Sequence, residues 1–218
     1  MVKIVNCDKI IRNELRGDSL VVLVSGGGSK ESNVVVNQYF ADLINNGAVL
    51  YIPNAGDESI RSYQDSYAYV KDMFNSIGIR KVDLCTNLNN ISLEMLNQYE
   101  AIYISGGSIS KLVGEIRSAG IVELIAWYEK EKVIYGQSGG GISLGKDVSY
   151  FEEARDTKPL GLIDCAITCH YKDEYYDHVL NGTRMNTYCI RDNEAVLFDG
   201  DNVEYINGEV LYIDRNNN

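Results

Sequence analysis

A serine enclosed by glycines, Ser138, has the surroundings that point most directly to chemistry. It lies in the segment VIYGQSGGGISLG, residues 133–145, which contains the pattern G-x-S-x-G. In that pattern a strained turn between a strand and a helix raises the serine hydroxyl above a sheet, and glycines let neighbouring backbone pass without steric clash. An apolar run precedes the motif and a helix-compatible run follows it. We therefore predict that Ser138 is a nucleophile and that the N–H of Gly139 stabilises its oxyanion, the alternative being a tight or phosphate-binding loop.

A serine nucleophile needs a base, and histidine is the usual one because it titrates near working pH. The chain has only two histidines. His170 follows the strand-like run LIDCAIT and is expected at a strand end, whereas His178 lies in the polar, helix-compatible segment DEYYDHVLNG. We therefore predict that His170 is the base. The competing interpretation is a histidine with a structural role.

An acidic side chain must orient that histidine. Carboxylates are abundant in this chain, so spacing alone does not choose among five candidates: Asp192, Glu194, Glu152, Glu153 and Asp173. The acid therefore stays open at the level of residue patterns.

Buried strands alternate with helices in the first part of the chain. The run DSLVVLVSGGGSK, residues 18–30, is continuously apolar and ends in a glycine turn, as expected of a strand buried on both faces of a parallel sheet. Further strands are predicted in AVLYIPNAG, IRKVDLCTN, AIYISGGS and KVIYGQSGGG. Helices are predicted in ESNVVVNQYFADLINNG, SIRSYQDSYAYVKDMFNSIG, SLEMLNQYE with Ser92 as its N-cap, ISKLVGEIRSAG and IVELIAWYEKEK.

This alternation predicts an α/β fold, a doubly wound and mostly parallel sheet with helices on both faces. Such folds bind ligands at the carboxyl ends of their strands. Glycine turns at residues 26–28, 106–107 and 136–141 are expected at that edge. After about residue 148 the pattern changes to LIDCAITCHY and AVLFDGDNVEYINGEVLYID, which predict C-terminal strands and hairpins at Asp-Gly and Asn-Gly turns. Residues 1–218 are predicted to form one domain with a frayed polar end at 216–218.

Composition excludes several classes of partner and site. The chain of 218 residues has a net charge of −11 and no basic run, so neither nucleic acid nor an anionic membrane is expected as a partner. Its five scattered cysteines are typical of a reducing compartment, and no signal peptide or membrane span is apparent, so we expect a soluble cytoplasmic protein. Cys165-x-x-x-Cys169-His170 lacks a second ligand pair, so no metal is predicted and the two cysteines are expected to be buried on a strand.

The motifs together resemble the serine peptidases of family S51, the aspartyl dipeptidase (peptidase E) and cyanophycinase group, whose fold is similar to class I glutamine amidotransferases. The resemblance covers nearly the whole chain through LVVLVSGGGS, VLYIPNA, AIYISGGS, GQSGGG, CHYKDE and IRDNEAVLFDGD. It implies a single α/β domain of this fold. Serine at the nucleophile position argues against a glutaminase, because that mechanism uses a thiolate.

Matching motifs imply roles for individual residues. Ser138 occupies the place of the family's nucleophile, and the turn that contributes to the family's oxyanion hole is matched by Gly106-Gly107-Ser108, so Gly107 and Gly139 are the implied N–H donors. The family's histidine is matched by His170. Its acidic residue near the last strands is matched by Asp192, although some members are assigned an acid that would correspond to Glu152 or Glu153.

Three positions depart from the family pattern. The Ala-Gly-Ala that usually follows the serine is Gly139-Gly140-Gly141, the asparagine of the oxyanion turn is Ser108, and the proline before the histidine is Cys169. Glycines keep the N–H donors but loosen the turn, so reduced activity or an altered substrate is one expectation.

The function predicted from these residues is serine-type hydrolysis of short peptides, with the resemblance implying dipeptides that carry an N-terminal aspartate. An acidic substrate side chain needs a cation, and Arg184 and Arg191 are the candidates near the proposed acid.

No cofactor is predicted, and the protein is expected to be a monomer or homodimer. The alternative is a noncatalytic amidotransferase-like module that binds a small ligand or regulates. An α/β-hydrolase esterase is disfavoured because the histidine comes late in that fold and the chain is short for it.

Overall fold

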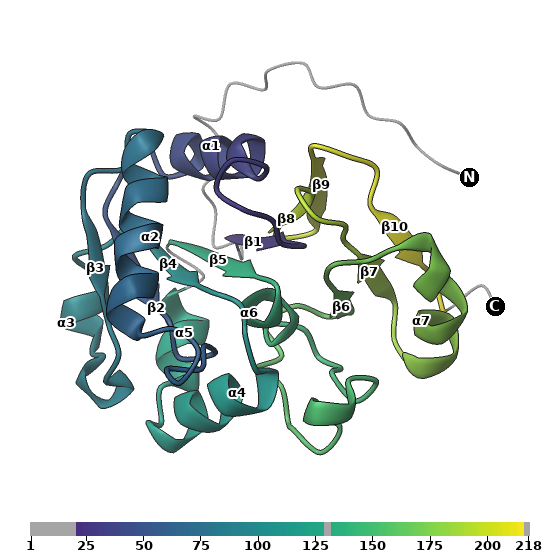
Figure 1. Ribbon diagram of the computed structural model, residues 1–218. Helices are drawn as coiled ribbons and strands as arrows, with labels where there is room; N and C mark the ends of the chain where they lie inside the picture. Colours follow the sequence, from purple (N-terminus) through teal and green to yellow (C-terminus); the bar gives the residue numbers. More distant parts are fainter. Residues whose placement is uncertain (1–20, 129–131, 216–218) are drawn as a thin grey trace.

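The computed structural model describes residues 21–128 and 132–215 (Figure 1). Some predictions lie outside the described residues. They concern Cys7, which is one of the five cysteines, the start of the first strand at residues 18–20, residues 129–131 at the end of the fifth predicted helix, and the polar end at 216–218. That residues 1–218 form a single domain stays a prediction.

A mostly parallel sheet lies at the centre of the described structure. Its seven strands follow the order β3-β2-β4-β5-β1-β8-β9. The five strands from β3 to β1 run parallel, whereas β8 and β9 are antiparallel additions at one edge. The predicted fold class is thereby confirmed. The strands span Val21–Ser25 (β1), Val49–Ile52 (β2), Val82–Leu84 (β3), Ala101–Ile104 (β4), Val133–Gln137 (β5), Ala195–Asp199 (β8) and Asn202–Ile206 (β9).

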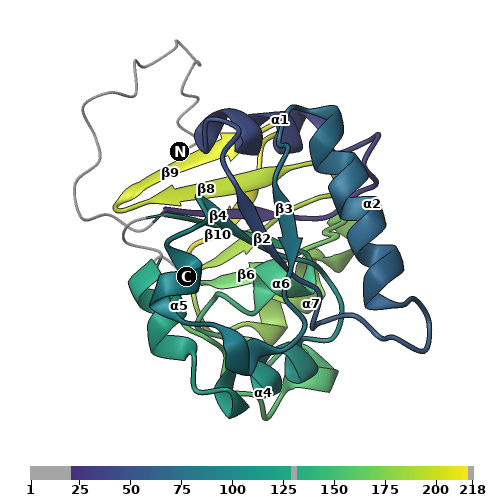
Figure 2. The same ribbon diagram turned by 90° about the vertical axis from the view of Figure 1, so that its left-hand side faces the viewer.

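Helices cover both faces of this sheet, as Figure 2 shows. Helices α1 (Val34–Leu43) and α2 (Tyr63–Ser76) lie on one face, and α3 (Leu93–Leu96), α4 (Ile109–Ser118) and α5 (Val122–Tyr128) lie on the other. The predicted cap of α3 is present, because the side chain of Ser92 accepts the N–H of Met95.

Alternation along the strands assigns residues to the two cores. Tyr103 and Tyr135 point toward α1 and α2, where their rings meet Phe74 and Phe40 at centroid distances of 5.0 Å and 4.8 Å. The residues one position earlier, Ile102 and Ile134, join the core beneath α4 and α5. The strands are therefore buried on both faces, as their continuous apolar runs predict.

A second sheet of three strands, in the order β10-β7-β6, lies beside the first and is drawn at the right of Figure 1. Strands β6 (Ala166–Thr168) and β7 (Thr187–Cys189) are parallel, and β10 (Leu211–Ile213) is antiparallel to β7. Helix α7 (Tyr176–Gly182) packs on it, and short 3-10 turns occur at Leu88–Asn90, Glu152–Ala154 and Asp173–Tyr175.

One of the two predicted C-terminal hairpins is present. The Asp199-Gly200 turn joins β8 to β9 as an antiparallel hairpin, which confirms the first. The hairpin expected at Asn207-Gly208 is wrong, because β10 does not pair with β9 but crosses to β7. Ile213 on β10 is buried against residues of the second sheet, so the pairing with β7 removes this apolar side chain from solvent.

One surface glycine offers a test of the helix assignment. Gly114 lies in the interior of α4, where a β-carbon would meet no atom within 4 Å. Glycine in an exposed helix interior costs backbone entropy, so Gly114→Ala is expected to stabilise the fold by about 0.5 to 1 kcal/mol. Urea unfolding of both proteins measures this difference. A destabilised variant would contradict the assignment of an open helical position.

Candidate active site

Ser138 occupies a strained turn at the end of β5, as its sequence motif predicts. Its backbone angles are φ 51° and ψ −125°, a backbone conformation that residues other than glycine rarely adopt. The turn is held by the hydrogen bond that the N–H of Ser138 donates to the carbonyl of Ser25, at 3.0 Å. Helix α6 (Gly139–Ile142) follows but is only one turn long.

The imidazole of His170 lies directly beside this serine. Ser138 Oγ and His170 Nε2 are 2.8 Å apart, and His170 Nδ1 is 2.6 Å from Oδ1 of Asp192. His170 and Asp192 both come from the second sheet. The parallel strands β6 and β7 end side by side; His170 follows β6, and Asp192 follows β7. The structure thus brings together three side chains that are 32 and 22 residues apart.

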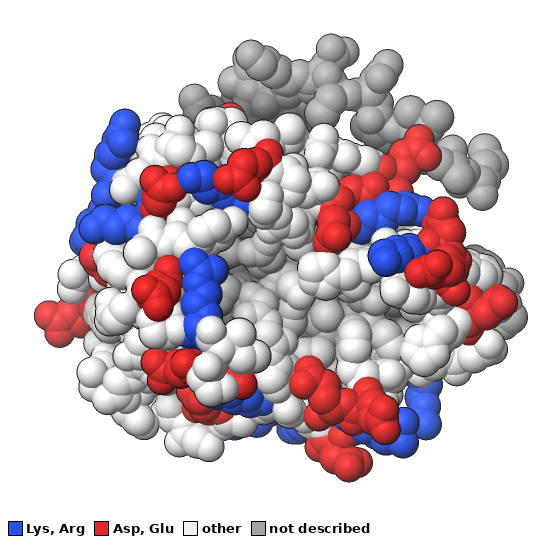
Figure 3. Space-filling model, in the orientation of Figure 1, with Lys and Arg blue, Asp and Glu red and all other residues white. Residues whose placement is uncertain are grey.

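This group faces solvent. The side chains of His170 and Asp192 are 54 % and 55 % exposed, and Ser138 is partly exposed. In Figure 3 the charged side chains lie around a hollowed, uncharged area over the region of α6, the helix that follows Ser138.

The other acidic candidates make contacts elsewhere. Glu153 accepts the backbone N–H of Ile109 at 3.1 Å and so caps the start of α4. Glu194 accepts the backbone N–H of Arg191, and burial raises the pKa of its carboxyl group. Asp173 pairs with the guanidinium of Arg191. Glu152 is exposed in the 3-10 turn.

Backbone N–H groups suited to an oxyanion lie next to Ser138. A β-carbon on Gly106 would be 2.8 Å from Cβ of Ser138, and one on Gly139 would be 2.2 Å from the carbonyl oxygen of Gly107. The turn after β4 therefore touches the turn after β5. Among the described residues neither Gly107 nor Gly139 donates its N–H to a backbone acceptor, which leaves both donors for a ligand.

The two arginines predicted to bind substrate differ in position. Arg191 precedes Asp192, and its guanidinium lies 5.3 Å from the ring centroid of Tyr171. Arg184 is not brought to Ser138, His170 and Asp192. It precedes β7, at the end of that strand opposite to Asp192.

A buried thiol lies next to Ser138. Cys169 is buried, and its Sγ donates weakly to the carbonyl of Ser25 at 3.5 Å. Burial raises the pKa of this thiol, which keeps it protonated. Cys165 and Cys169 are free buried thiols, as expected, but they flank β6 instead of lying on it. The described residues contain no cluster of side chains suited to a metal ion.

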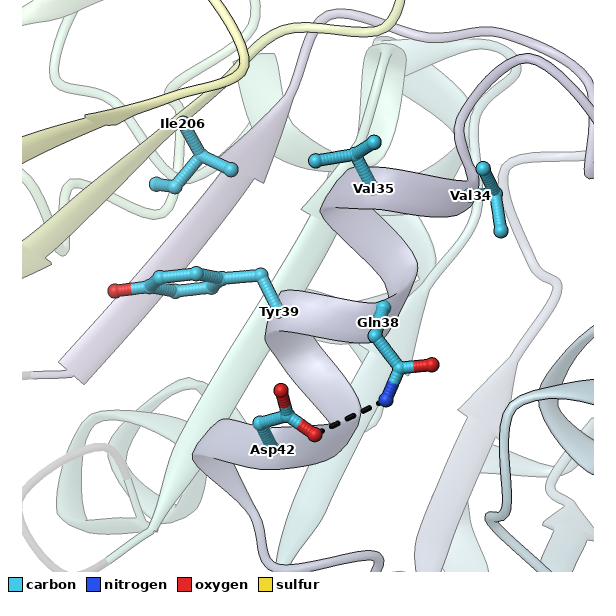
Figure 4. Close-up of a pocket in the computed structure, with 6 residues that line it drawn as sticks. All are labelled: Val34, Val35, Gln38, Tyr39, Asp42 and Ile206. Atoms are coloured by element: carbon cyan, nitrogen blue, oxygen red, sulfur yellow. Dashed lines mark hydrogen bonds between the residues drawn. The ribbon is translucent and has the colours of Figure 1, made fainter. Parts of the chain in front are cut away.

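A separate surface hollow lies between α1 and β9 (Figure 4). Gln38 Nε2 donates to Asp42 Oδ1 at 3.0 Å within it. Ser138, His170 and Asp192 do not line this hollow, so it is not part of the candidate active site. Its lining residues are Val34, Val35, Gln38, Tyr39, Asp42 and Ile206.

Comparison with known proteins decides the family. Residues 21–206 match the sequence model of peptidase family S51. The chain belongs to peptidase family S51. An uncharacterized peptidase from Pasteurella multocida (strain Pm70) is 28% identical over 145 residues, which are 61% of this chain and 69% of the relative. As a member of this family, the chain is a peptidase and acts on a peptide substrate.

Solved structures support the same fold for this S51 peptidase. A candidate peptidase E from Listeria monocytogenes EGD-e superposes with a TM-score of 0.67 at 19% identity, covering 86% of this chain and 98% of that one. A peptidase from an acI-B1 Actinobacterium gives a TM-score of 0.72 at 17% identity, covering 91% and 96%. The architecture is consistent with the class I glutamine amidotransferase-like fold. Across the described residues, no helix is both long enough and apolar enough to span a membrane.

Two positions at which this S51 peptidase departs from the family motif, Gly139 and Ser108, make specific contacts in the structure. Gly139, where the motif usually has alanine, approaches the carbonyl of Gly107 too closely for a β-carbon in the present backbone. The glycine at this position permits that close approach, and the expected effect of the departures on activity stays a prediction. Ser108 caps α4, because its Oγ accepts the N–H of Lys111 at 3.3 Å.

Gly27 contacts the imidazole of His170, which the residue pattern does not predict. The turn at residues 26–28 was expected at the sheet edge, but its contact with His170 was not. A β-carbon on Gly27 would lie 2.3 Å from Cε1 of His170 and 2.9 Å from Oδ1 of Asp192. The glycine run itself was the available signal, yet nothing in the spacing of residues 27 and 170 indicates that they meet.

Proposed function

We propose that this S51 peptidase is of the serine type, with Ser138 as nucleophile, His170 as general base and Asp192 as the acid that orients the imidazole. The observation that carries the proposal is the continuous hydrogen-bonded series from Ser138 Oγ to His170 (2.8 Å) and from His170 to Asp192 (2.6 Å). The strained backbone of the serine adds support, because such strain collects at functional turns.

The reaction would proceed by acyl transfer to water. His170 Nε2 takes the proton of Ser138 Oγ as the oxygen attacks the scissile carbonyl, and the N–H groups of Gly107 and Gly139 hold the resulting oxyanion. Collapse breaks the C–N bond, and the imidazolium gives its proton to the departing amine. Water then attacks the acyl-serine with His170 again as base, which releases the acid product and restores the serine hydroxyl.

Asp192 would fix the tautomer of the imidazole. Its Oδ1 accepts the Nδ1–H of His170, so that Nε2 is left as the acceptor for the serine proton. No metal or cofactor takes part in the proposed steps.

We propose short peptides as substrates, above all dipeptides with an N-terminal aspartate. Arg191 is the cation that supports this preference, because it is next to Asp192 in the chain and its planar guanidinium can bind a carboxylate with two hydrogen bonds. Its present partner Asp173 is an exposed side chain, which a substrate carboxylate can replace. Arg184 has less support, since it lies at the opposite end of β7.

The test is hydrolysis of a panel of dipeptides, Asp-X beside Leu-X and Ala-X, by the purified protein and by Ser138→Ala. We expect cleavage restricted to Asp-X and lost in the variant. Cleavage of Leu-X or Ala-X at equal rates would keep the serine peptidase but refute the acidic preference. A folded protein that cleaves none of the panel would favour the noncatalytic ligand-binding module, which otherwise has only the departures of the motif in its support.

We further propose that the protein works in the cytoplasm as a monomer or homodimer, without nucleic acid or membrane as partner. The four described cysteines are free thiols, as expected in a reducing compartment. Light scattering of the purified protein measures the number of subunits.

A further inference from the structure

Gln137, the residue before the nucleophile, links three neighbouring strands. It ends β5, which lies between β4 and β1 in the sheet. Its Oε1 accepts a hydrogen bond from the hydroxyl of Tyr103 on β4. Its Nε2 donates to the carbonyl oxygen of Gly28, in the turn after β1, at 3.2 Å. One side chain thus joins both neighbours of the strand that carries Ser138.

Tyr103 is a rigid anchor for this link. Its side chain is 1% exposed and packs between the rings of Phe74 and Tyr135, each at a centroid distance of 5.0 Å. Burial raises the pKa of its hydroxyl, so the hydroxyl stays protonated and acts as a donor. That donor fixes the orientation of the Gln137 amide, with oxygen toward Tyr103 and nitrogen toward Gly28.

The turn at residues 26–28, to which Gln137 bonds, is in direct contact with His170. The backbone N–H of His170 donates to the carbonyl of Gly26 at 3.0 Å, and the N–H of Asn193 donates to the carbonyl of Gly27 at 2.9 Å. A β-carbon on Gly27 would collide with the imidazole, so the ring and the turn are in direct contact. A displacement of the turn therefore displaces the histidine relative to the serine.

We propose that Gln137 is a positioning residue of this peptidase: by holding the carbonyl of Gly28, it keeps the turn at residues 26–28, and with it the imidazole of His170, within hydrogen-bond distance of Ser138. The inference rests on the proposed function of Ser138 and His170 and adds to it a residue whose side-chain hydrogen bonds go to Tyr103 and Gly28. The carbonyl and amino groups of Gln137 are engaged by Tyr103 and Gly28, so its loss acts on kcat and leaves KM nearly unchanged.

The kinetic test compares Gln137→Met and Tyr103→Phe with the wild-type protein on the best dipeptide of the panel. Methionine keeps the length of the side chain and removes both hydrogen bonds. We expect kcat to fall by about tenfold to a hundredfold, because misplacement of reacting groups by about 1 Å has effects of this size. The double variant should be little worse than Gln137→Met, since both changes break one series of contacts. Gln98→Met, at an exposed glutamine on the surface, is the matched control.

A spectroscopic test reads the position of His170 without catalysis. The chain has two histidines, so the low-field proton signal of a bonded imidazole Nδ1–H is assigned by comparison with His178→Gln. We expect this signal in the wild-type protein and in Gln98→Met, and its broadening or loss in Gln137→Met. If Gln137→Met fails to fold, Tyr103→Phe carries the same comparison. A KM increase at constant kcat would overturn the inference, because it would make Gln137 a substrate contact.

Labelling of Ser138 with a fluorophosphonate separates failure of this inference from failure of the proposed function. Wild-type protein that resists labelling refutes the activated serine and the role of Gln137 with it. Wild-type and Gln137→Met proteins labelled at equal rates refute the role of Gln137 alone. Slower labelling of Gln137→Met, with labelling of Gln98→Met unchanged, supports it.

Discussion

Replacing Ser138 with alanine is expected to lower kcat/KM for dipeptide hydrolysis by at least about 10⁴-fold, because loss of a triad nucleophile leaves only binding and oxyanion stabilisation. The oxygen removed is the one that lies 2.8 Å from His170 Nε2. Steady-state hydrolysis of the best Asp-X dipeptide measures the loss. Thermal unfolding should be nearly unchanged, since alanine keeps the β-carbon and the strained backbone of the turn.

A matched control for this variant lies five residues further along the chain. Ser143→Ala removes a hydroxyl that donates to the carbonyl of Gly140, in α6, at 2.7 Å and not to the imidazole. Its activity should stay within a few-fold of the wild type if the protein folds. Undiminished hydrolysis by Ser138→Ala would assign the activity to another nucleophile or to a contaminant.

Local sequence patterns predicted the fold because the apolar pattern of each strand and helix reflects which of its faces are buried. The strand before Ser138 is apolar because both its faces are buried: Tyr135 lies in the core beneath α1 and α2, and Ile134 lies in the core beneath α4 and α5. The same reasoning placed Ser138 on a turn and His170 near a strand end. It did not predict that β10 pairs with β7, because Leu211 and Ile213 fit either sheet by pattern; in the second sheet Ile213 is buried and Leu211 is partly buried.

The partners of the histidine were harder to predict than the histidine itself. Asp192 meets His170 because β6 and β7 run parallel in the second sheet, and three-residue strands give too short a pattern to reveal that pairing. Family resemblance, not spacing, singled it out. Gln137 was missed for a similar reason, since its bonds to Tyr103 and Gly28 depend on the order of β4, β5 and β1.

Asp192→Asn is the second change with a large expected effect, a loss in kcat of about 10⁴-fold with KM nearly unchanged. Asparagine fills the same space, but its amide N–H can face the imidazole and favour the tautomer whose Nε2 carries the proton. That tautomer cannot accept the proton of Ser138. The pH range from about 6 to 9 should be covered, so that a shifted profile is not mistaken for a lost activity.

Isosteric changes at the other carboxylates decide whether Asp192 alone has this role. Glu194→Gln, Glu153→Gln and Asp173→Asn each remove a charge whose contacts lie with Arg191 or with the start of α4, so each should retain at least about a tenth of the wild-type kcat. Asp173→Asn also frees Arg191, and a lower KM for Asp-X in that variant would support Arg191 as the substrate cation. A 10⁴-fold loss in Glu153→Gln with an active Asp192→Asn would instead move the acid to the segment between the serine and the histidine.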